Sequence, residues 1–217
     1  MSTVTAQHTQ SIDADKLIRW SGFTLILAGL LFGLFPFAHP NHDPQGFRGA
    51  AWIPAHLMPN VGAIVALFGL VGLFVRQFRA AGTLGLAAFI ASIVGTASFV
   101  SGLMIEAFII PYMSLELPQL TIDDAPPPGI GEAFMVMRML FMLGFLLVGA
   151  AVIRARILPR GVGVLVIVAI LANTFGDMII GEPAFYLGSV LFGIALGWLG
   201  YALWAEPRGR VHSGSLQ

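Results

Sequence analysis

Six apolar stretches, each close to 20 residues long, constrain the fold of this chain more than any other feature of its sequence. About 20 consecutive apolar residues in a helix are enough to cross the hydrocarbon core of a bilayer. The sequence therefore predicts an all-α fold, a six-helix transmembrane bundle. The six predicted spans cover residues 18–37, 53–75, 84–110, 134–153, 162–180 and 185–204.

Basic residues distinguish the two ends of these spans. All but two of the 11 lysine and arginine residues fall on one side of the membrane if the N-terminus lies inside. The exceptions are Arg48, in a loop on the other side, and Arg138, within a span. Because cytoplasmic loops carry an excess of Lys and Arg, an N-in, C-in orientation is expected. The residues on the inner side are Lys16, Arg19, Arg76, Arg79, Arg154, Arg156, Arg160, Arg208 and Arg210.

The lengths of the connections predict how the spans pair. Only a few residues separate Arg76 from Gly82 and Arg154 from Arg160, so spans 2 and 3, and spans 4 and 5, are expected to form two tight inner-side helical hairpins. Residues 1–17 and 205–217 are polar and are expected to be disordered cytoplasmic tails around a single transmembrane domain at 18–204. Residues 123–129 contain three consecutive prolines and are expected to be extended, as a lid or a linker.

The amino-acid composition limits where this protein can be located and which reactions it can carry out. With 57% hydrophobic and 10% charged residues, the chain has no loop long enough to fold as a separate soluble domain. The first span is as long as the others and lacks a small-residue cleavage pattern after it, so we expect it to be retained, in the bacterial inner (cytoplasmic) membrane. The absence of cysteine excludes disulfides, thiolate catalysis and iron–sulfur ligation.

Several classes of function do not fit the sequence. The outer loops carry no basic patch, so nucleic acid is not an expected partner, whereas the lipid bilayer is. Lys16 is the only lysine and lies outside the spans, which excludes a retinal protein. His56 is the only histidine within a span, which argues against bis-histidine haem, and no phosphate-binding loop is present. No cofactor is therefore predicted.

Polar side chains within the spans carry the most functional information, because a charge in hydrocarbon costs about 2.5–3.5 kcal/mol even on the mildest scale. A rise of about 1.5 Å per residue, counted from the inner turns, places five of these side chains in the outer third of the bundle. They are His56, Asn60, Glu106, Arg138 and Asp177. Arg138 and Asp177 come at equal depth on neighbouring antiparallel helices, so a buried ion pair is expected. The predicted ligand-binding residues, including the i, i+4 pairs His56/Asn60 and Asn173/Asp177, are His56, Asn60, Glu106, Arg138, Asn173 and Asp177.

This polar cluster has more than one interpretation. One interpretation is that its members form contacts that hold neighbouring helices together, as the pairs Arg138–Asp177 and His56–Glu106. The other is that they line an outward-facing pocket. In the second case a polytopic membrane protein binds or passes a small amphipathic or anionic molecule, which Arg138 recognises through an anionic or carbonyl oxygen. An alternative is an integral-membrane enzyme acting on a lipid-soluble substrate by carboxylate acid–base chemistry, with Glu106, Asp177 and His56 as catalytic candidates. A further alternative is a structural subunit of a membrane complex.

Two histidines in the first outer loop form a weaker pattern. His39 and His42, followed by Asp43, offer donors that converge with His56 if they bind a metal ion. The segment lacks the i, i+4 spacing of paired helical histidines and contains prolines, so a solvated turn is the favoured interpretation and no metal is predicted. The methionines that begin span 4 are expected to fill the core or to line an apolar pocket; they are Met135, Met137, Met139 and Met142.

Small residues recur at helical spacing. Gly29 with Gly33, and Gly193 with Gly197, form GxxxG motifs that let helix backbones approach closely in lipid. We expect these motifs to build the bundle in preference to a dimer. A homo-oligomer, or another membrane partner bound through glycine-rich faces, stays open.

Several short motifs resemble those of a group of uncharacterised multi-span bacterial membrane proteins. They are Trp52-Ile53-Pro54-Ala55-His56, Gly69-Leu70-Val71-Gly72-Leu73 with Arg76-Gln77, Arg154-Ala155-Arg156-Ile157-Leu158-Pro159-Arg160, and Gly197-Trp198-Leu199-Gly200-Tyr201. The likeness covers spans 2 to 6 and implies a membrane bundle, with no assigned reaction or ligand. Small integral-membrane terpene cyclases offer an analogy of architecture, with no motif in common.

Overall fold

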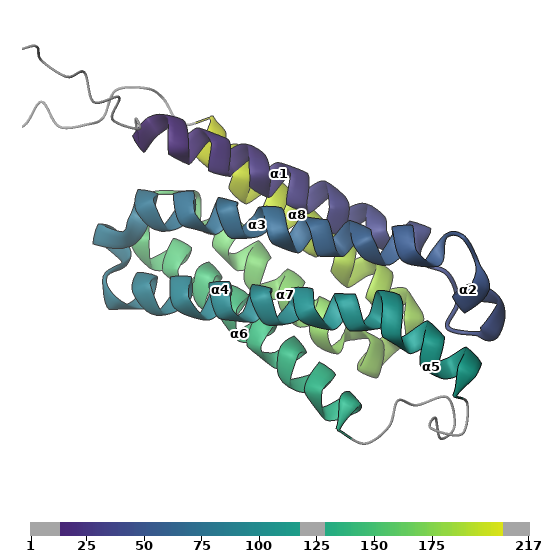
Figure 1. The fold of residues 1–217 in the computed structure, drawn as a ribbon. Helices are drawn as coiled ribbons and strands as arrows, with labels where there is room; N and C mark the ends of the chain where they lie inside the picture. The colour runs from purple at the N-terminus through teal and green to yellow at the C-terminus, as the bar shows by residue number, and fades with distance from the viewer. Residues whose placement is uncertain (1–13, 118–128, 206–217) are drawn as a thin grey trace, which may run out of the picture.

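The computed structural model describes residues 14–117 and 129–205, and this part of the chain is helical, with no strand (Figure 1). Of the tails predicted at 1–17 and 205–217, residues 1–13 and 206–217 lie outside the described residues, whereas residues 14–17 belong to a helix. Of the proline-rich loop predicted at 123–129, residues 123–128 also lie outside them. A π-helical turn, η1 (Ile105–Ile109), joins two of the helices. The helices are α1 (Ala14–Ala38), α2 (Pro44–Arg48), α3 (Trp52–Ala81), α4 (Thr83–Met104), α5 (Ile110–Glu116), α6 (Ile130–Ala155), α7 (Arg160–Ile180) and α8 (Glu182–Trp204).

Five helical segments of the described chain are long and apolar enough to cross a membrane. They are α1, α3, the continuous run Thr83–Glu116 formed by α4, η1 and α5, α6, and Tyr186–Trp204 of α8. α7 has 21 residues, but its apolar segment, Arg160–Gly176, is shorter than these five segments. The helices mark the chain as a multi-pass membrane protein, and the sixth span stays a prediction.

The six long helices pack as a closed ring. Each contacts the next in the order α1, α3, α4, α6, α7, α8 and back to α1 (Figure 1). α3 and α4 meet at Gly82, and residues 156–159 join α6 to α7, so both predicted hairpins are confirmed as pairs of neighbouring helices. Gly82 can form so short a turn because its φ of 61° lies in a region that side chains rarely adopt.

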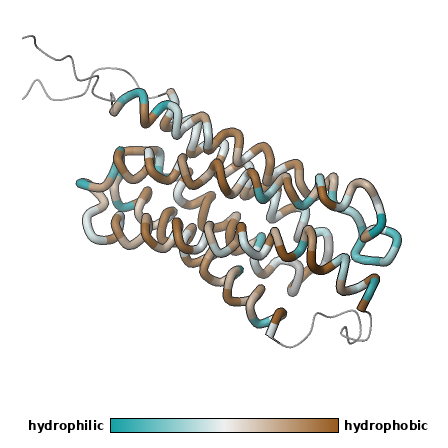
Figure 2. The backbone as a smooth tube through the Cα atoms, viewed as in Figure 1, coloured by the Kyte–Doolittle hydropathy of each residue, from teal (hydrophilic) through white to brown (hydrophobic). Residues whose placement is uncertain are grey.

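The two ends of the ring carry different features. We call the end with the α3–α4 and α6–α7 turns the turn end, and the opposite end, which carries α2 and α5, the pocket end (Figure 1). Figure 2 shows the hydrophilic residues gathered towards both ends, with a hydrophobic zone between them. Most basic residues of the described chain lie in the helices and turns of the turn end, whereas Arg48 in α2 and Arg138 at the cavity lie towards the pocket end. Those of the turn end are Lys16, Arg19, Arg76, Arg79, Arg154, Arg156 and Arg160.

α1 and α8 are in backbone contact through the predicted GxxxG motifs. A Cβ atom built on Gly29 lies 2.4 Å from the carbonyl oxygen of Gly193, and one built on Gly193 lies 2.5 Å from the carbonyl oxygen of Gly29. Separations this short leave no room for a side chain. The prediction that these motifs build the bundle is therefore confirmed, while association with a second copy or another protein stays a prediction.

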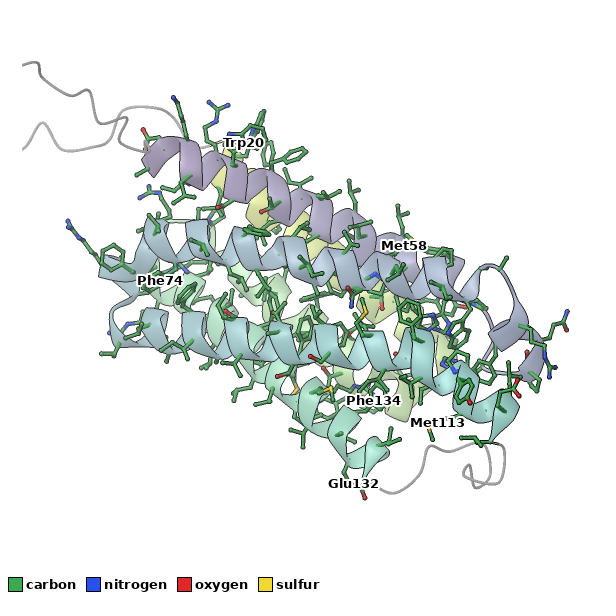
Figure 3. The ribbon with its side chains drawn as sticks, viewed as in Figure 1. Trp20, Met58, Phe74, Met113, Glu132 and Phe134 are labelled. Carbon is green, nitrogen blue, oxygen red and sulfur yellow. The ribbon has the colours of Figure 1, made fainter. Side chains whose placement is uncertain are left out.

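The outer faces of the ring are apolar. Trp20, for example, is 68% exposed and points away from the bundle on α1 (Figure 3). A continuous apolar surface of this kind is suited to contact with acyl chains. Other large exposed side chains, from every helix of the ring, include Leu30, Phe68, Val94, Val136, Val168 and Ile194.

Phenylalanines fill the centre of the ring. Phe32 of α1, Phe99 of α4, Phe141 and Phe145 of α6, and Phe192 of α8 pack ring against ring, with neighbouring centroids 4.4 to 6.2 Å apart. Phe145 and Phe192 are at most 1% exposed. We call these five side chains the phenylalanine plug. It lies between the pocket end and the turn end.

Candidate functional site

A cavity of about 680 Å³ lies at the pocket end of the ring. This volume is typical of small-molecule sites, which combine apolar walls with a few polar groups. Three members of the phenylalanine plug, Phe32, Phe99 and Phe141, line it. Phe134, on the first turns of α6, lies at this end (Figure 3). Further apolar lining comes from Phe35, Leu103, Met135 and Met137, and polar lining from His39, His42, Glu106, Arg138, Asn173, Thr174, Tyr186 and Ser189.

The loop after α1 brings two histidines to the wall of this cavity. Asp43 caps α2, because its Oδ1 accepts a hydrogen bond from the backbone N–H of Gly46 at 2.7 Å. A Cβ atom at Gly46 would lie 2.0 Å from the carbonyl oxygen of Asn41, so this position requires glycine. The tight loop that results places the rings of His39 and His42 against each other, with centroids 4.9 Å apart.

Glu106 reaches the same place from the η1 turn. Pro111 has no N–H to donate to the carbonyl of Ala107, and its ring clashes with that carbonyl in a regular α-helix. The N–H of Ile110 donates instead to the carbonyl of Ile105, five residues earlier. π-helical turns are rare, and they occur frequently at functional sites. This one changes the direction in which Glu106 leaves its helix.

His56 is fully buried near the start of α3. Its Nδ1 lies 2.8 Å from the carbonyl oxygen of Trp52, so Nδ1 carries the proton and Nε2 carries the lone pair. Among the described residues, Nε2 of His56 has no hydrogen-bond partner. The ring of Trp52 lies 4.1 Å from that of His56, and its Nε1–H donates to the carbonyl oxygen of Glu106 at 3.3 Å. Trp52 therefore fixes both the imidazole and the η1 turn.

Four side chains converge at this point. The donor atoms of His39, His42, His56 and Glu106 all lie within 4.8 Å of one another, and we call these residues the His–Glu cluster. Nε2 of His42 is 3.4 Å, and Nε2 of His56 is 3.9 Å, from Oε1 of Glu106. Burial, and after it the nearby His56 and His42, lowers the pKa of His39 to about 4. His39 is therefore neutral at pH 7.

Arg138 lines the cavity from α6. Its Nη2 donates to the carbonyl oxygen of Asn173 at 3.3 Å and to that of Thr174, which ties α6 to α7. Nδ2 of Asn173 donates to Oγ of Ser189 at 2.9 Å, which ties α7 to α8. The side chain of Asp177 lies outside the described residues, so its ion pair with Arg138 stays a prediction.

The cavity unites part of the predicted ligand-binding set. Glu106, Arg138 and Asn173 line it, while His56 lies behind them in the His–Glu cluster. Asn60 is absent from the described lining, and its Nδ2 donates to a carbonyl oxygen of α4, that of residue 100, at 3.0 Å. The structure thus shows Asn60 as a tie between α3 and α4.

The loop histidines differ from the solvated turn favoured by the sequence. His42 is 53% exposed at its side chain, but His39 is half-buried, with its ring centroid 4.8 Å from that of His56. Asp43, the acidic donor expected beside them, caps α2 instead. Glu106, a carboxylate far away in the sequence, takes that place.

Three contributors to the site were not among the residues predicted for it from the sequence. Trp52 stands four residues before His56, and this spacing puts an aromatic ring and the histidine on one helix face. Pro111 lies within a span, five residues after the carboxylate of Glu106. A proline inside a helix is a sequence signal for a local break in helical hydrogen bonding. Ser189 carries no signal, because small hydroxyl residues are common in membrane helices.

Fold alone does not imply function, so the function of this protein has to be inferred from the site and its chemistry. Comparison of the chain with protein-family models, with curated proteins and with solved structures gave no match.

Proposed function

We propose that this multi-pass membrane protein binds a small amphipathic molecule, with an anionic or carbonyl head group, in the cavity at the pocket end. The observation that carries the proposal is the composition of the cavity wall. It combines Arg138, Glu106 and uncharged hydrogen-bonding groups with the apolar side chains of Phe134, Met135 and Met137. A guanidinium recognises a carboxylate, phosphate or carbonyl oxygen, and phenylalanine and methionine side chains accommodate an apolar tail.

Binding is favoured over passage through the protein. The phenylalanine plug occupies the axis of the ring below the cavity, and Phe141, Phe145 and Phe192 are at most 3% exposed. A molecule that crossed the membrane along this axis would have to displace several closely packed rings. The cavity therefore supports a binding site at the pocket end.

We further propose that the chain has six spans, with both termini on the cytoplasmic side of the bacterial inner membrane. Basic residues gather at the turn end, as the excess of Lys and Arg on cytoplasmic loops requires. In this orientation the pocket end faces outwards. The bound molecule then enters from the periplasm or exterior, or from the outer leaflet.

Two other functions stay predictions. An integral-membrane enzyme that uses Glu106 as a general acid has some support, because Glu106 lines the cavity beside His42 and His56. The same reaction through Asp177 concerns a side chain outside the described residues. A structural subunit of a membrane complex has no observation in its favour beyond the apolar faces that every membrane helix presents.

A cavity-filling substitution tests the binding proposal. Gly131 lines the cavity, and a Cβ atom built there meets nothing within 4 Å, so Gly131→Trp adds bulk without a backbone clash. Val136 lies on the same helix and is 57% exposed, so Val136→Trp is a matched control. We expect native mass spectrometry of purified wild type and Val136→Trp to show a co-purifying small molecule, reduced at least tenfold in Gly131→Trp.

Thermal unfolding of all three proteins shows whether the tryptophan has altered folding. Equal amounts of the co-purifying molecule in Gly131→Trp and wild type would place it outside the cavity. Wild-type protein that carries nothing beyond bulk lipid would contradict the proposal. Arg138→Gln adds a test of the head group: an anionic molecule should be lost while any neutral lipid stays.

A further inference from the structure

We propose that the His–Glu cluster binds one divalent transition-metal ion of the zinc class. Its donors are three imidazole nitrogens, from His39, His42 and His56, and the carboxylate of Glu106. Zn²⁺ and its first-row neighbours take this mixture of nitrogen and oxygen donors, whereas Mg²⁺ and Ca²⁺ take oxygen almost exclusively. Metal binding here goes beyond the proposed pocket function and does not depend on it.

His56 has the hydrogen bond and the ring orientation that metal-binding histidines usually have. Histidines that bind metals usually donate their other ring N–H to a carbonyl or carboxylate, which fixes the tautomer and the ring orientation. Nδ1 of His56 has this partner in the carbonyl oxygen of Trp52, at 2.8 Å. Nε2 therefore presents a lone pair towards Glu106, and the Trp52 ring holds the imidazole from one side.

The same atom argues against a cluster held by hydrogen bonds alone. Nε2 of His56 is fully buried and has no hydrogen-bond partner among the described residues. Its distance of 3.9 Å from Oε1 of Glu106 is too long for a hydrogen bond, and without a proton Nε2 cannot donate one. A buried lone pair with no partner is unfavourable, and a metal ion would satisfy it.

The spacing of the donors is close to that of a metal site. Ligands about 2.0–2.2 Å from a tetrahedral ion lie about 3.4 Å from one another. His42 and Glu106 already have this separation, at 3.4 Å, and the widest separation in the cluster is 4.8 Å. The cluster has to contract by somewhat more than 1 Å, and the partly exposed loop side chain of His42 can supply the movement.

The position of the cluster gives the ion access to the pocket. His39, His42 and Glu106 line both the cavity and the cluster, so an ion held by them faces the cavity. A zinc ion can expand to five ligands. A carboxylate or carbonyl oxygen of the molecule in the pocket would then be the fifth ligand. This last step rests on the proposed function, whereas metal binding itself does not.

Metal binding is tested on the full chain, purified in detergent without a polyhistidine tag and stripped with a chelator. Titration with Zn²⁺ in a calorimeter, and elemental analysis after gel filtration, should give one ion per chain. Glu106→Gln keeps the size of the side chain and should lower the affinity at least tenfold. Glu116→Gln is the matched control, because Glu116 is an exposed carboxylate on α5, ten residues further along. It should bind as wild type does.

His56→Gln, which also removes a ligand, should lose the ion as well. If this buried substitution prevents folding, the conservative Glu106→Gln variant still decides the question. Wild-type protein with far less than one zinc ion per chain, or equal losses in Glu106→Gln and Glu116→Gln, would overturn the proposal. The co-purifying molecule is measured separately, so failure of the metal site leaves the pocket proposal standing, and the reverse is also true.

Discussion

At the scale of single residues, the loop between α1 and α3 shows how strictly one position can be determined. Asp43 accepts a hydrogen bond from the N–H of Gly46, and this bond starts α2. Gly46 in turn packs so closely against the carbonyl oxygen of Asn41 that no side chain fits. These two contacts hold the short loop in the path that places His39 and His42 in the His–Glu cluster.

Replacing the loop glycine should therefore release the loop. In Gly46→Ala the new Cβ atom would lie 2.0 Å from the carbonyl oxygen of Asn41, and overpacking of this kind costs about 1–3 kcal/mol. We expect a lower unfolding temperature and faster tryptic cleavage after Arg48, which lies in the same segment. Gly131→Ala, at a position with open space, should show neither change. Unchanged cleavage in Gly46→Ala would mean that the loop adapts without opening.

At the scale of helices, α1 and α8 pack backbone against backbone. Their backbones touch at Gly29 and Gly193, and again at Gly22 and Gly200, where a Cβ atom on either glycine would lie 2.4 to 2.6 Å from the other's carbonyl oxygen. No hydrophobic effect draws helices together within lipid, so close van der Waals contact has to do so. The first and last spans are joined in this way, and the ring is closed.

A matched pair within one GxxxG motif tests this closure. Gly193→Ala places a methyl group 2.5 Å from the carbonyl oxygen of Gly29 and 2.7 Å from Cα of Gly33, so α1 and α8 must separate. We expect a loss of about 1–3 kcal/mol, seen as a lower unfolding temperature in detergent. Gly197→Ala adds the same methyl group where nothing lies within 4 Å, and its stability should match wild type. Equal stability of the two variants would mean that the α1–α8 contact contributes little.

At the scale of the whole molecule, the ring is polarised along its axis. The turn end carries basic residues, the phenylalanine plug fills the centre, and the cavity and the His–Glu cluster occupy the pocket end. The orientation of the ring in the membrane determines which compartment would supply the proposed molecule and metal ion. The proposed orientation, with the turn end in the cytoplasm, rests on the preference of arginine and lysine for cytoplasmic loops.

The absence of native cysteine makes this orientation simple to measure. Gln45 is exposed at the pocket end, and Ala80 is exposed at the turn end. We expect a membrane-impermeant maleimide to label Gln45→Cys in intact cells and to label Ala80→Cys only after the membrane is broken. The reverse pattern would show that the pocket opens to the cytoplasm. Wild-type protein, which has no thiol, gives the background of the assay.

The path of the chain through the membrane could be read from local sequence. Apolar length predicts the helices, and short basic connections predict the two hairpins that pack as neighbours. The depth of Glu106 and Arg138 could be counted along single helices, and Asn173 was expected with them because it shares a helix face with Asp177; all three line the cavity. Arg138 and Asp177 show the limit of such counting, since equal depth predicts a contact without specifying its geometry.

The sequence by itself therefore determined the helices and their apolar surfaces, because these depend on properties of consecutive residues. Only the tertiary structure decided which polar groups meet. His39 and His42 approach His56 and Glu106 because a loop folds back over α3 and a π-helical turn redirects a carboxylate. Neither event leaves a periodic signal in the sequence. Contacts between residues 39 and 106 depend on how six helices close into a ring, and that closure is set by glycine contacts between the first helix and the last.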